Sequence, residues 1–201
     1  RSFGSGDLPR VENMKSTPTP FSLFPCGVCL ALLLLAPVAH AQDFILPGGP
    51  LPPDCTASGS TVTCTDDVEI GEDEVVAING SVDWVIEGAL DVGKEAMVND
   101  GGAAGDLTVQ VDGDVELKKD ATVVGDIVAG GEIKLKDGSS VDGNITSDDE
   151  IKLEKNASVG GNVDAAKKVE VKDGSSVDGN ITSDDEIKLQ KNASVEGNVD
   201  A

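Results

Sequence analysis

The stretch VDGNITSDDEIKLEKNAS (residues 141–158) is followed by VGGNVDAAKKVEVKDGSS (159–176) and then by VDGNITSDDEIKLQKNAS (177–194). Each segment has 18 residues, and all three share one pattern of apolar and glycine residues. The preceding segment 123–140 fits the same frame, and an incomplete copy follows at 195–201. A repeat of constant length indicates a solenoid, in which each copy forms one turn stacked on the turn before it.

The spacing of apolar residues within one turn predicts short β-strands. After Val141, the next apolar residues are Ile145, Ile151, Leu153 and Ala157. Steps of two place side chains on one buried face of a strand, and steps of six divide the turn into three sides. No helical periodicity occurs in the repeats. We therefore predict an all-β protein whose fold is a three-sided parallel β-helix, a solenoid with 18 residues per turn.

One glycine recurs in each turn and predicts a corner of the solenoid, where the backbone bends or approaches another chain segment closely. These glycines are Gly125, Gly143, Gly161, Gly179 and Gly197. Asparagine and aspartate are frequent beside them and at a second corner, as turns prefer. Four N-x-S/T sequons start at asparagines of these corners, and we interpret them as turn residues rather than as glycosylation sites. They are Asn144, Asn156, Asn180 and Asn192.

Charged residues alternate in sign from turn to turn, which predicts stacked ion pairs on the outside of the solenoid. One column consists of Lys119, Asp137, Lys155, Asp173 and Lys191. A second corner alternates between the acidic segments 148–150 and 184–186 and the lysines of 166–168. Opposite charges on neighbouring strands stabilise a sheet modestly and disfavour a slip of one turn.

The composition is acidic and poor in aromatic residues. The 201 residues carry a formal net charge of −22, the isoelectric point is near 4.1, and aromatic residues make up 2%. Such a charge argues against nucleic acid as a partner, because phosphates would be repelled. A solvated acidic surface that keeps the protein soluble explains the charge, and a cation-binding surface is the alternative.

The first part of the chain has the features of an export signal. Residues 1–13 precede Met14 and are interpreted as an upstream or disordered segment. Residues 14–41 contain a lysine, an apolar run and an A-x-A motif that ends at Ala41. This order is typical of a signal peptide. We expect cleavage near Ala41 and a mature protein in the periplasm, at the cell surface or in the extracellular space.

Two further regions follow the predicted signal peptide. Residues 42–54 are rich in proline and glycine and are interpreted as a linker, and residues 55–201 are assigned to the β-helix domain, with regular repeats over 105–201. Cys55 and Cys64 are the cysteines that remain after cleavage. An even number of cysteines in an exported chain predicts a disulfide, which here would close a hairpin at the first edge of the solenoid.

The residues needed for most enzymatic sites do not occur together in this sequence. The single histidine, His40, lies in the predicted signal peptide. We therefore predict no catalytic residues, no metal ligands and no cofactor, and a protein that is not an enzyme. Carboxylate pairs such as Asp148 and Asp149 can act in acid–base catalysis, but they recur beside lysines at a corner. Calcium binding by aspartate-rich turns stays open.

The repeat resembles the bactofilin family of polymer-forming cytoskeletal β-helix proteins. The matching residues are a V-x-G-[ND]-[IV] step, at 123–127, 141–145 and 177–181, and an E-[IV]-x-[LV] strand, at 132–135 and 150–153. The likeness covers about residues 105–201. It implies a right-handed triangular β-helix that polymerises end to end without nucleotide. The predicted signal peptide departs from the family, whose members usually work in the cytoplasm against the inner membrane.

Three functional hypotheses follow. In the first, the protein is a non-enzymatic structural component of the cell envelope or matrix whose partner is a second copy of itself. The unpaired strand edges and aliphatic side chains of the last turn would form the contact, with Ile187, Val195 and Val199 as its residues. In the second, it is a cell-surface or adhesion module whose acidic corner meets cations or glycans. An enzyme with an unrecognised site is the third and weakest hypothesis.

Overall fold

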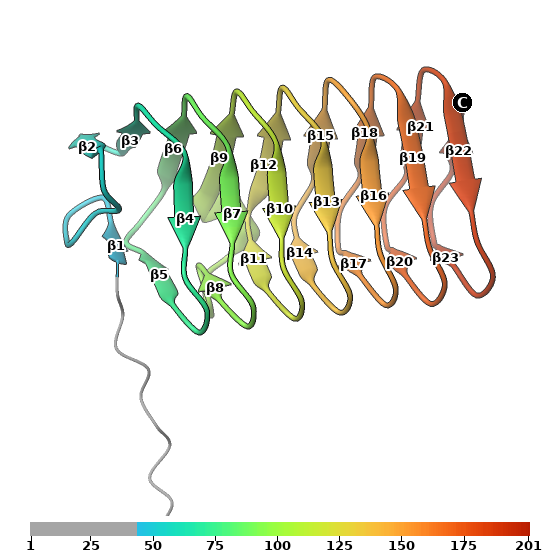
Figure 1. The fold of residues 1–201 in the computed structure, drawn as a ribbon, viewed down its shortest axis with the longest axis horizontal. Coiled ribbons are helices and arrows are strands. Elements are labelled where there is room, and N and C mark those ends of the chain that lie inside the picture. Colours follow the sequence, from blue (N-terminus) through green and yellow to red (C-terminus); the bar gives the residue numbers. More distant parts are fainter. Residues whose placement is uncertain (1–43) are drawn as a thin grey trace, which may run out of the picture. The chain divides into compact units, whose positions relative to one another are not determined.

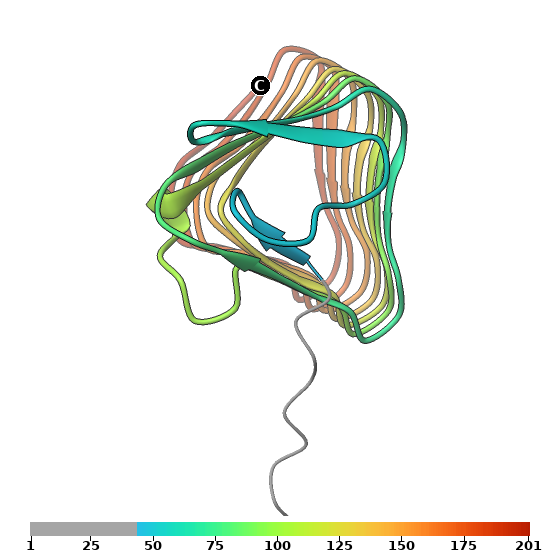
Figure 2. The ribbon, with the colours of Figure 1, turned by 90° about the vertical axis from the view of Figure 1, so that its left-hand side faces the viewer.

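The computed structural model describes residues 44–201, and these residues form a solenoid of three sheets (Figure 1). The predicted signal peptide, His40 and the segment before Met14 lie outside the described residues. Regular turns contribute one strand to each sheet, and the turns superimpose as a triangle when the solenoid is viewed along its axis (Figure 2). The predicted three-sided parallel β-helix is therefore confirmed.

Each side of the triangle is one sheet. The eight-strand sheet contains β1 (Phe44–Leu46), β5 (Val75–Ile78), β8 (Met97–Val98), β11 (Thr122–Val124), β14 (Ser140–Asp142), β17 (Ser158–Val159), β20 (Ser176–Val177) and β23 (Ser194–Val195). The seven-strand sheet contains β4 (Val68–Ile70), β7 (Leu90–Val92), β10 (Val115–Leu117), β13 (Ile133–Leu135), β16 (Ile151–Leu153), β19 (Lys168–Val171) and β22 (Glu186–Leu189).

The third side is the nine-strand sheet. It contains β2 (Cys55–Ser58), β3 (Thr61–Cys64), β6 (Val82–Ile86), β9 (Leu107–Val111), β12 (Asp126–Ala129), β15 (Ile145–Ser147), β18 (Val163–Ala165), β21 (Ile181–Ser183) and β24 (Val199–Asp200). All neighbouring strands of the three sheets are parallel, with the antiparallel pair of β2 and β3 as the exception. This exception lies at the N-terminal end of the solenoid.

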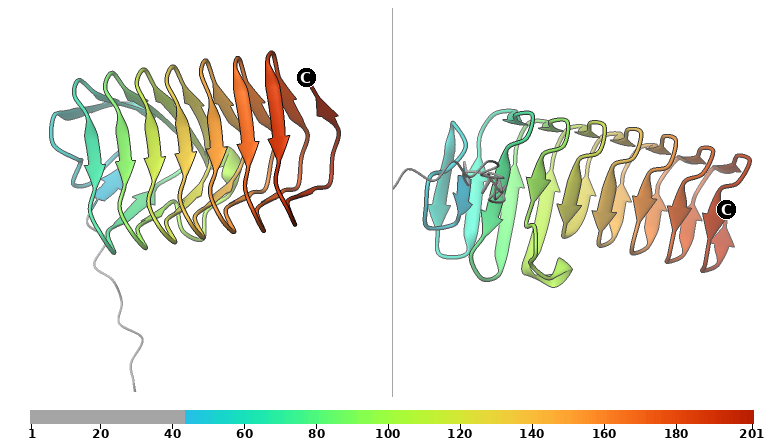
Figure 3. Two further views of the ribbon diagram at one scale, coloured as in Figure 1. Left: turned by 45° about the vertical axis from the view of Figure 1, so that its right-hand side comes forward. Right: turned by 90° about the horizontal axis from the view of Figure 1, so that it is seen from below.

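The register follows the sequence repeat, because equivalent residues of successive turns pair directly. Ile133 pairs with Ile151, and Leu135 pairs with Leu153. These side chains point inward and are fully buried, so the core consists of aliphatic columns that run along the axis. Earlier turns are longer: Val115 pairs with Leu90, and the extra residues form a loop with a 3-10 turn, η1 (Ala104–Asp106). This loop projects from the regular outline (Figures 2 and 3).

Two inward-facing positions alternate between alanine and serine in successive turns, which gives the core a double-turn repeat. Ala129 is followed by Ser147, and Ala157 by Ser175, and all four are buried. The hydroxyl of Ser147 donates a hydrogen bond of 2.7 Å to the carbonyl oxygen of Gly131. The buried serines therefore find acceptors at the corners, and their burial leaves no unsatisfied hydroxyl.

The corners are of two kinds. At one corner the backbone is left-handed, with positive φ at Asp120, Gly138, Asn156 and the equivalent residues of the following turns. At the corner of the recurrent glycines, successive turns approach closely: a Cβ atom on Gly161 would lie 2.5 Å from the carbonyl oxygen of Gly143. The sequence prediction of a close approach is thus confirmed. Asparagine, aspartate and glycine tolerate the left-handed corner better than other residues.

The region interpreted as a linker differs from the prediction. Residues 44–46 form β1, which pairs in parallel with β5, and Leu46 is fully buried. The three consecutive apolar residues Phe44, Ile45 and Leu46 supply the strand that the first turn of the eight-strand sheet requires. Pro52 is also buried, and Leu51 packs against the core. The solenoid therefore includes residues 44–46, which precede the predicted boundary at Cys55.

We expect Gly161→Ala to lower the free energy of unfolding by about 2 kcal/mol, because its methyl group must displace the backbone of the preceding turn. Urea unfolding followed by circular dichroism measures this change. Gly105→Ala is the matched control, since a Cβ atom there meets no atom within 4 Å. Equal stability of the two variants would contradict the close approach.

Candidate functional site

The two ends of the solenoid are the candidate site, because within residues 44–201 the terminal strand of each sheet has a neighbour on one side only. At the C-terminal end the edge strands are β22, β23 and β24. At the N-terminal end they are β1, β2 and β4. Unpaired N–H and C=O groups on such strands are ready to pair with another strand.

The C-terminal end carries the three residues predicted for self-association. Ile187 and Val195 are half-buried and pack against the core, while the side chain of Val199 is 47% exposed. The last turns lie together at this end of the rod (Figure 3). Sequence reasoning did not include Leu189, which is 44% exposed. Leu189 is the last member of a column whose earlier members, such as Leu135 and Leu153, are buried. Its position at the end of that column is the signal that could have identified it.

The N-terminal end is closed by a hairpin. Strands β2 and β3 pair in antiparallel register, and a disulfide joins Cys55 to Cys64 across the hairpin. Cys64 is fully buried, and the indole N–H of Trp84 donates a hydrogen bond of 3.2 Å to its sulfur. The backbone between β1 and β2 runs across this end, inside the triangular outline (Figure 2). The two ends are therefore different surfaces.

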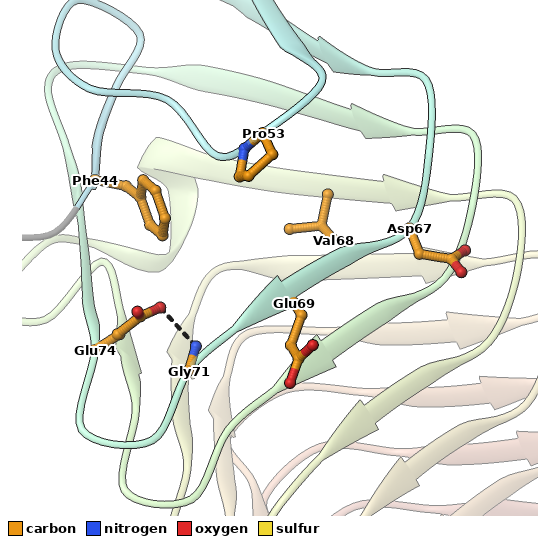
Figure 4. A pocket seen from close by; sticks show the side chains of 7 residues that line it. All are labelled: Phe44, Pro53, Asp67, Val68, Glu69, Gly71 and Glu74. Atoms are coloured by element: carbon orange, nitrogen blue, oxygen red, sulfur yellow. Dashed lines mark hydrogen bonds between the residues drawn. The ribbon is translucent and has the colours of Figure 1, made fainter.

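A cavity of about 410 Å³ lies beside β4 at the N-terminal end (Figure 4). Its lining consists of Phe44, Pro53, Asp67, Val68, Glu69, Gly71 and Glu74. The carboxylate of Glu74 accepts a hydrogen bond from the backbone N–H of Gly71, which fixes one wall. The lining combines two rings with three carboxylates.

Ion pairs gather on and beside the outer face of the seven-strand sheet. Lys136 contacts Glu116 at 2.7 Å, and Lys172 contacts Glu154 at 2.7 Å. The Lys167–Asp149 pair, at 2.8 Å, joins two of the corner segments whose charges were predicted to stack. Pairs between successive members of the Lys119 column do not occur within residues 44–201. These residues lie next to the left-handed corner, and Lys119, Asp137, Lys155 and Lys191 are exposed to solvent.

A ladder of side-chain hydrogen bonds crosses the nine-strand sheet from turn to turn, at the N-terminal ends of its strands. Its members are Asp126, Asn144, Asn162, Asn180 and Asn198. The side-chain oxygen of Asn144 accepts one hydrogen bond from the backbone N–H of Asn162, at 2.9 Å, and one from its side-chain amide, at 3.1 Å. The asparagine ladder thus adds to the main-chain pairing between turns. It ends at Asn198, beside the exposed Val199.

Residues 44–201 contain neither a membrane-spanning helix nor a metal-ligand cluster. No helix in residues 44–201 combines the length and the apolar character that a membrane crossing requires. In this part of the chain, histidine, cysteine and acidic side chains do not gather in groups of three or more that could hold a metal ion.

The comparison with known proteins identifies one family. A family model described as bactofilin, polymer-forming cytoskeletal, matches residues 76–181 and 117–201. Together the two matches cover more than half of the chain. No match was found among curated proteins or among solved structures.

The ion pair of Glu116 and Lys136 gives the protein a predicted pH dependence. The hydrogen bond from Lys136 lowers the pKa of Glu116 below its ordinary value of 4.5. A carboxylate with a lowered pKa in the folded state adds stability above its unfolded pKa. That stability is lost as the pH falls through the folded pKa. Both side chains are more than a third exposed, so screening limits the effect to about 0.5 kcal/mol.

We therefore expect Lys136→Met to lower the free energy of unfolding by about 0.5 kcal/mol at neutral pH, and we expect this deficit to shrink as the pH falls through the lowered pKa of Glu116 and its carboxylate becomes protonated. Denaturant titrations at several pH values measure the difference. Lys155→Met removes the same charge at an exposed corner and serves as the control. A constant deficit at all pH values would show that the lysine acts through packing instead.

Proposed function

The chain belongs to the bactofilin family of polymer-forming cytoskeletal proteins, and from this premise we propose that it self-associates end to end into filaments. The family and the β-solenoid make it a structural protein. One observation carries the end-to-end proposal: among residues 44–201, the last turn combines unpaired strand edges with exposed aliphatic side chains. Leu189 and Val199 are each more than 40% exposed, although the equivalent residues of earlier turns are buried.

The physical reason for association is the same as for stacking within one chain. A turn buries its aliphatic side chains by contact with the turns on both sides of it. At the C-terminal end, Val199 meets a turn on one side, through its pairing with Ile181. A second copy would bury the remaining apolar surface and pair the free edges of β22, β23 and β24. We propose Ile187, Val195 and Val199, together with Leu189, as the contact residues.

We further propose that the protein acts outside the cytoplasm, as a component of the cell envelope or matrix. The predicted signal peptide over residues 14–41 supports this location. The Cys55–Cys64 disulfide is consistent with it, because disulfides persist in oxidising compartments.

A surface adhesion or cation-binding module is the second candidate, favoured by the net charge of −22. Calorimetry with Ca²⁺ separates the two functions. Binding heat and a higher melting temperature would support the cation-binding module. If Ca²⁺ gives neither binding heat nor a higher melting temperature, and the protein forms filaments, the structural function is the one that remains supported.

We expect Val199→Asp to prevent filament formation, because a charge at the centre of the contact would be buried without a partner. Negative-stain electron microscopy and light scattering of the purified protein measure the effect. Val128→Asp is the matched control: Val128 is 43% exposed, but it lies in β12, away from both ends. A wild-type protein that stays a single chain at high concentration would rule out the proposed function.

Export has its own test. We expect the protein secreted from an expression host to begin at Gln42, which mass spectrometry of the intact chain can determine. Replacing the small residue at the cleavage motif, in Ala41→Arg, should block processing. An unprocessed wild-type chain that stays in the cytoplasm would contradict the proposed location.

A further inference from the structure

The corner between β5 and β6 differs from the regular corners of the solenoid (Figure 1). It consists of Asn79, Gly80 and Ser81, and all three residues are exposed. Asn79 is the one asparagine of the chain that is followed by glycine. A Cβ atom on Gly80 would meet no atom within 4 Å, whereas Gly161, at the corner of the recurrent glycines, has no such space. Neighbouring turns therefore leave the corner at Asn79 uncovered.

The peptide unit between Asn79 and Gly80 is free of main-chain pairing. Within residues 44–201, the carbonyl oxygen of Asn79 accepts no backbone hydrogen bond and the N–H of Gly80 donates none. The N–H of Asn79 itself donates to the carbonyl oxygen of Leu46 at 2.8 Å, so the corner is anchored on its β5 side. Gly80 has a φ of +80°, in a region that glycine adopts readily. This peptide unit can therefore rotate without breaking a hydrogen bond.

The asparagines of the ladder are held in the opposite way. The N–H of Ile145, which follows Asn144, donates to the carbonyl oxygen of Asn162 at 2.9 Å. The side-chain amide of Asn144 donates to the carboxylate of Asp126 at 3.0 Å. Asn162 has the equivalent hydrogen bonds one turn later. In the ladder, both the asparagine side chain and the backbone nitrogen that follows it are thus engaged.

We propose that Asn79 is a site of spontaneous covalent modification, in which the backbone nitrogen of Gly80 attacks the side-chain amide and converts Asn79 to aspartate or isoaspartate. Three observations support the site: a glycine follows the asparagine, the corner is uncovered, and its peptide unit is unpaired. Glycine is important because it has no Cβ atom that would hinder the approach of its nitrogen to the Asn79 side chain.

The reaction needs water as its one co-reactant. The nitrogen of Gly80 forms a bond to Cγ of Asn79, and the C–N bond of the side-chain amide breaks. The amide nitrogen leaves as ammonia, together with the proton that Gly80 loses, and a cyclic imide remains. Water then adds to one of the two imide carbonyls. Opening on one side gives aspartate, and opening on the other side gives isoaspartate, in which the main chain runs through Cγ.

The fold accommodates either product. Each product carries a carboxylate where the asparagine was neutral, and isoaspartate also adds one carbon atom to the main chain. Because the peptide unit between Asn79 and Gly80 is unpaired, neither change breaks a main-chain hydrogen bond. The buried Val76 and Val82, on either side of the corner, keep their partners Val98 and Leu107 in the next turn. The modification therefore marks the chain without opening the solenoid.

The first measurement follows the mass of the purified protein during incubation at neutral pH, because loss of the amide raises the mass. We expect Asn79 in the folded protein to react within about tenfold of the rate of a free peptide of residues 75–83, since uncovered loops open at almost no cost in free energy. Peptide mapping should show the asparagines of the ladder unmodified over the same period. A folded protein that reacts more slowly than this range would overturn the proposal.

The second measurement tests the nucleophile. We expect Gly80→Ala to slow the loss of the amide by about tenfold or more, because a Cβ atom disfavours the left-handed backbone and hinders the nitrogen. Ser81→Ala is the matched control, since it changes the same corner, keeps the asparagine–glycine pair and should react like the wild type. Both substitutions are also made in the free peptide, which has no fold to lose. Equal rates for Gly80→Ala and the wild type would exclude Gly80 as the nucleophile.

The third measurement concerns the tolerance of the fold. Ion-exchange chromatography separates modified from unmodified chains, and we expect their melting temperatures to agree within about 2–4 °C, the shift that about one lost hydrogen bond would cause. Asn79→Asp carries the new charge without the additional main-chain carbon, so it separates the two changes. A larger fall in the modified chain, with Asn79→Asp unaffected, would show that the corner does not accommodate isoaspartate.

These measurements are independent of the proposed function, because each of them is made on single chains. A protein that forms no filaments would contradict end-to-end association and leave the reaction at Asn79 to be decided by the mass data. An unreactive Asn79 would overturn this inference and leave end-to-end association standing.

Discussion

Main-chain pairing between equivalent residues of successive turns is the interaction on which this protein depends. Each residue of a regular strand meets its counterpart 18 positions away, as Ile133 meets Ile151. Pairing therefore brings identical or similar side chains into columns, and a column of aliphatic residues is buried along its whole length. A slip of the register by one residue would move every buried side chain of a strand to the outer face and every outer side chain into the core. The fold, the core and the surface pattern are consequences of this one constraint.

The corners hold the register in place. Successive glycines allow the backbones of adjacent turns to approach so closely that a methyl group at Gly161 has no room. The asparagine ladder runs beside this corner and adds side-chain hydrogen bonds between the same turns. Surface ion pairs such as Lys136 with Glu116 contribute less, because water screens them. Geometry at the corners, more than charge, therefore defines how one turn lies on the next.

The two ends of the solenoid satisfy that constraint differently. At the C-terminal end, Leu189 and Val199 keep the outward side of their columns uncovered. At the N-terminal end, Leu51 and Pro52 cover the core, and β2 pairs with β3 in the antiparallel direction. Within residues 44–201, the two ends are therefore chemically different surfaces.

The sequence by itself determined the all-β class, the 18-residue period, the aliphatic columns and the close approach at the recurrent glycine. The reason is that the spacing between equivalent residues can be read directly from an exact repeat. It also placed Ile187, Val195 and Val199 in the last turn. Only the tertiary structure decided that residues 44–46 form a strand and that Leu189 is exposed. The physical reason is that these features depend on which neighbours a residue meets at the ends of the stack. A column gives the same local sequence signal whether its last member is covered or open.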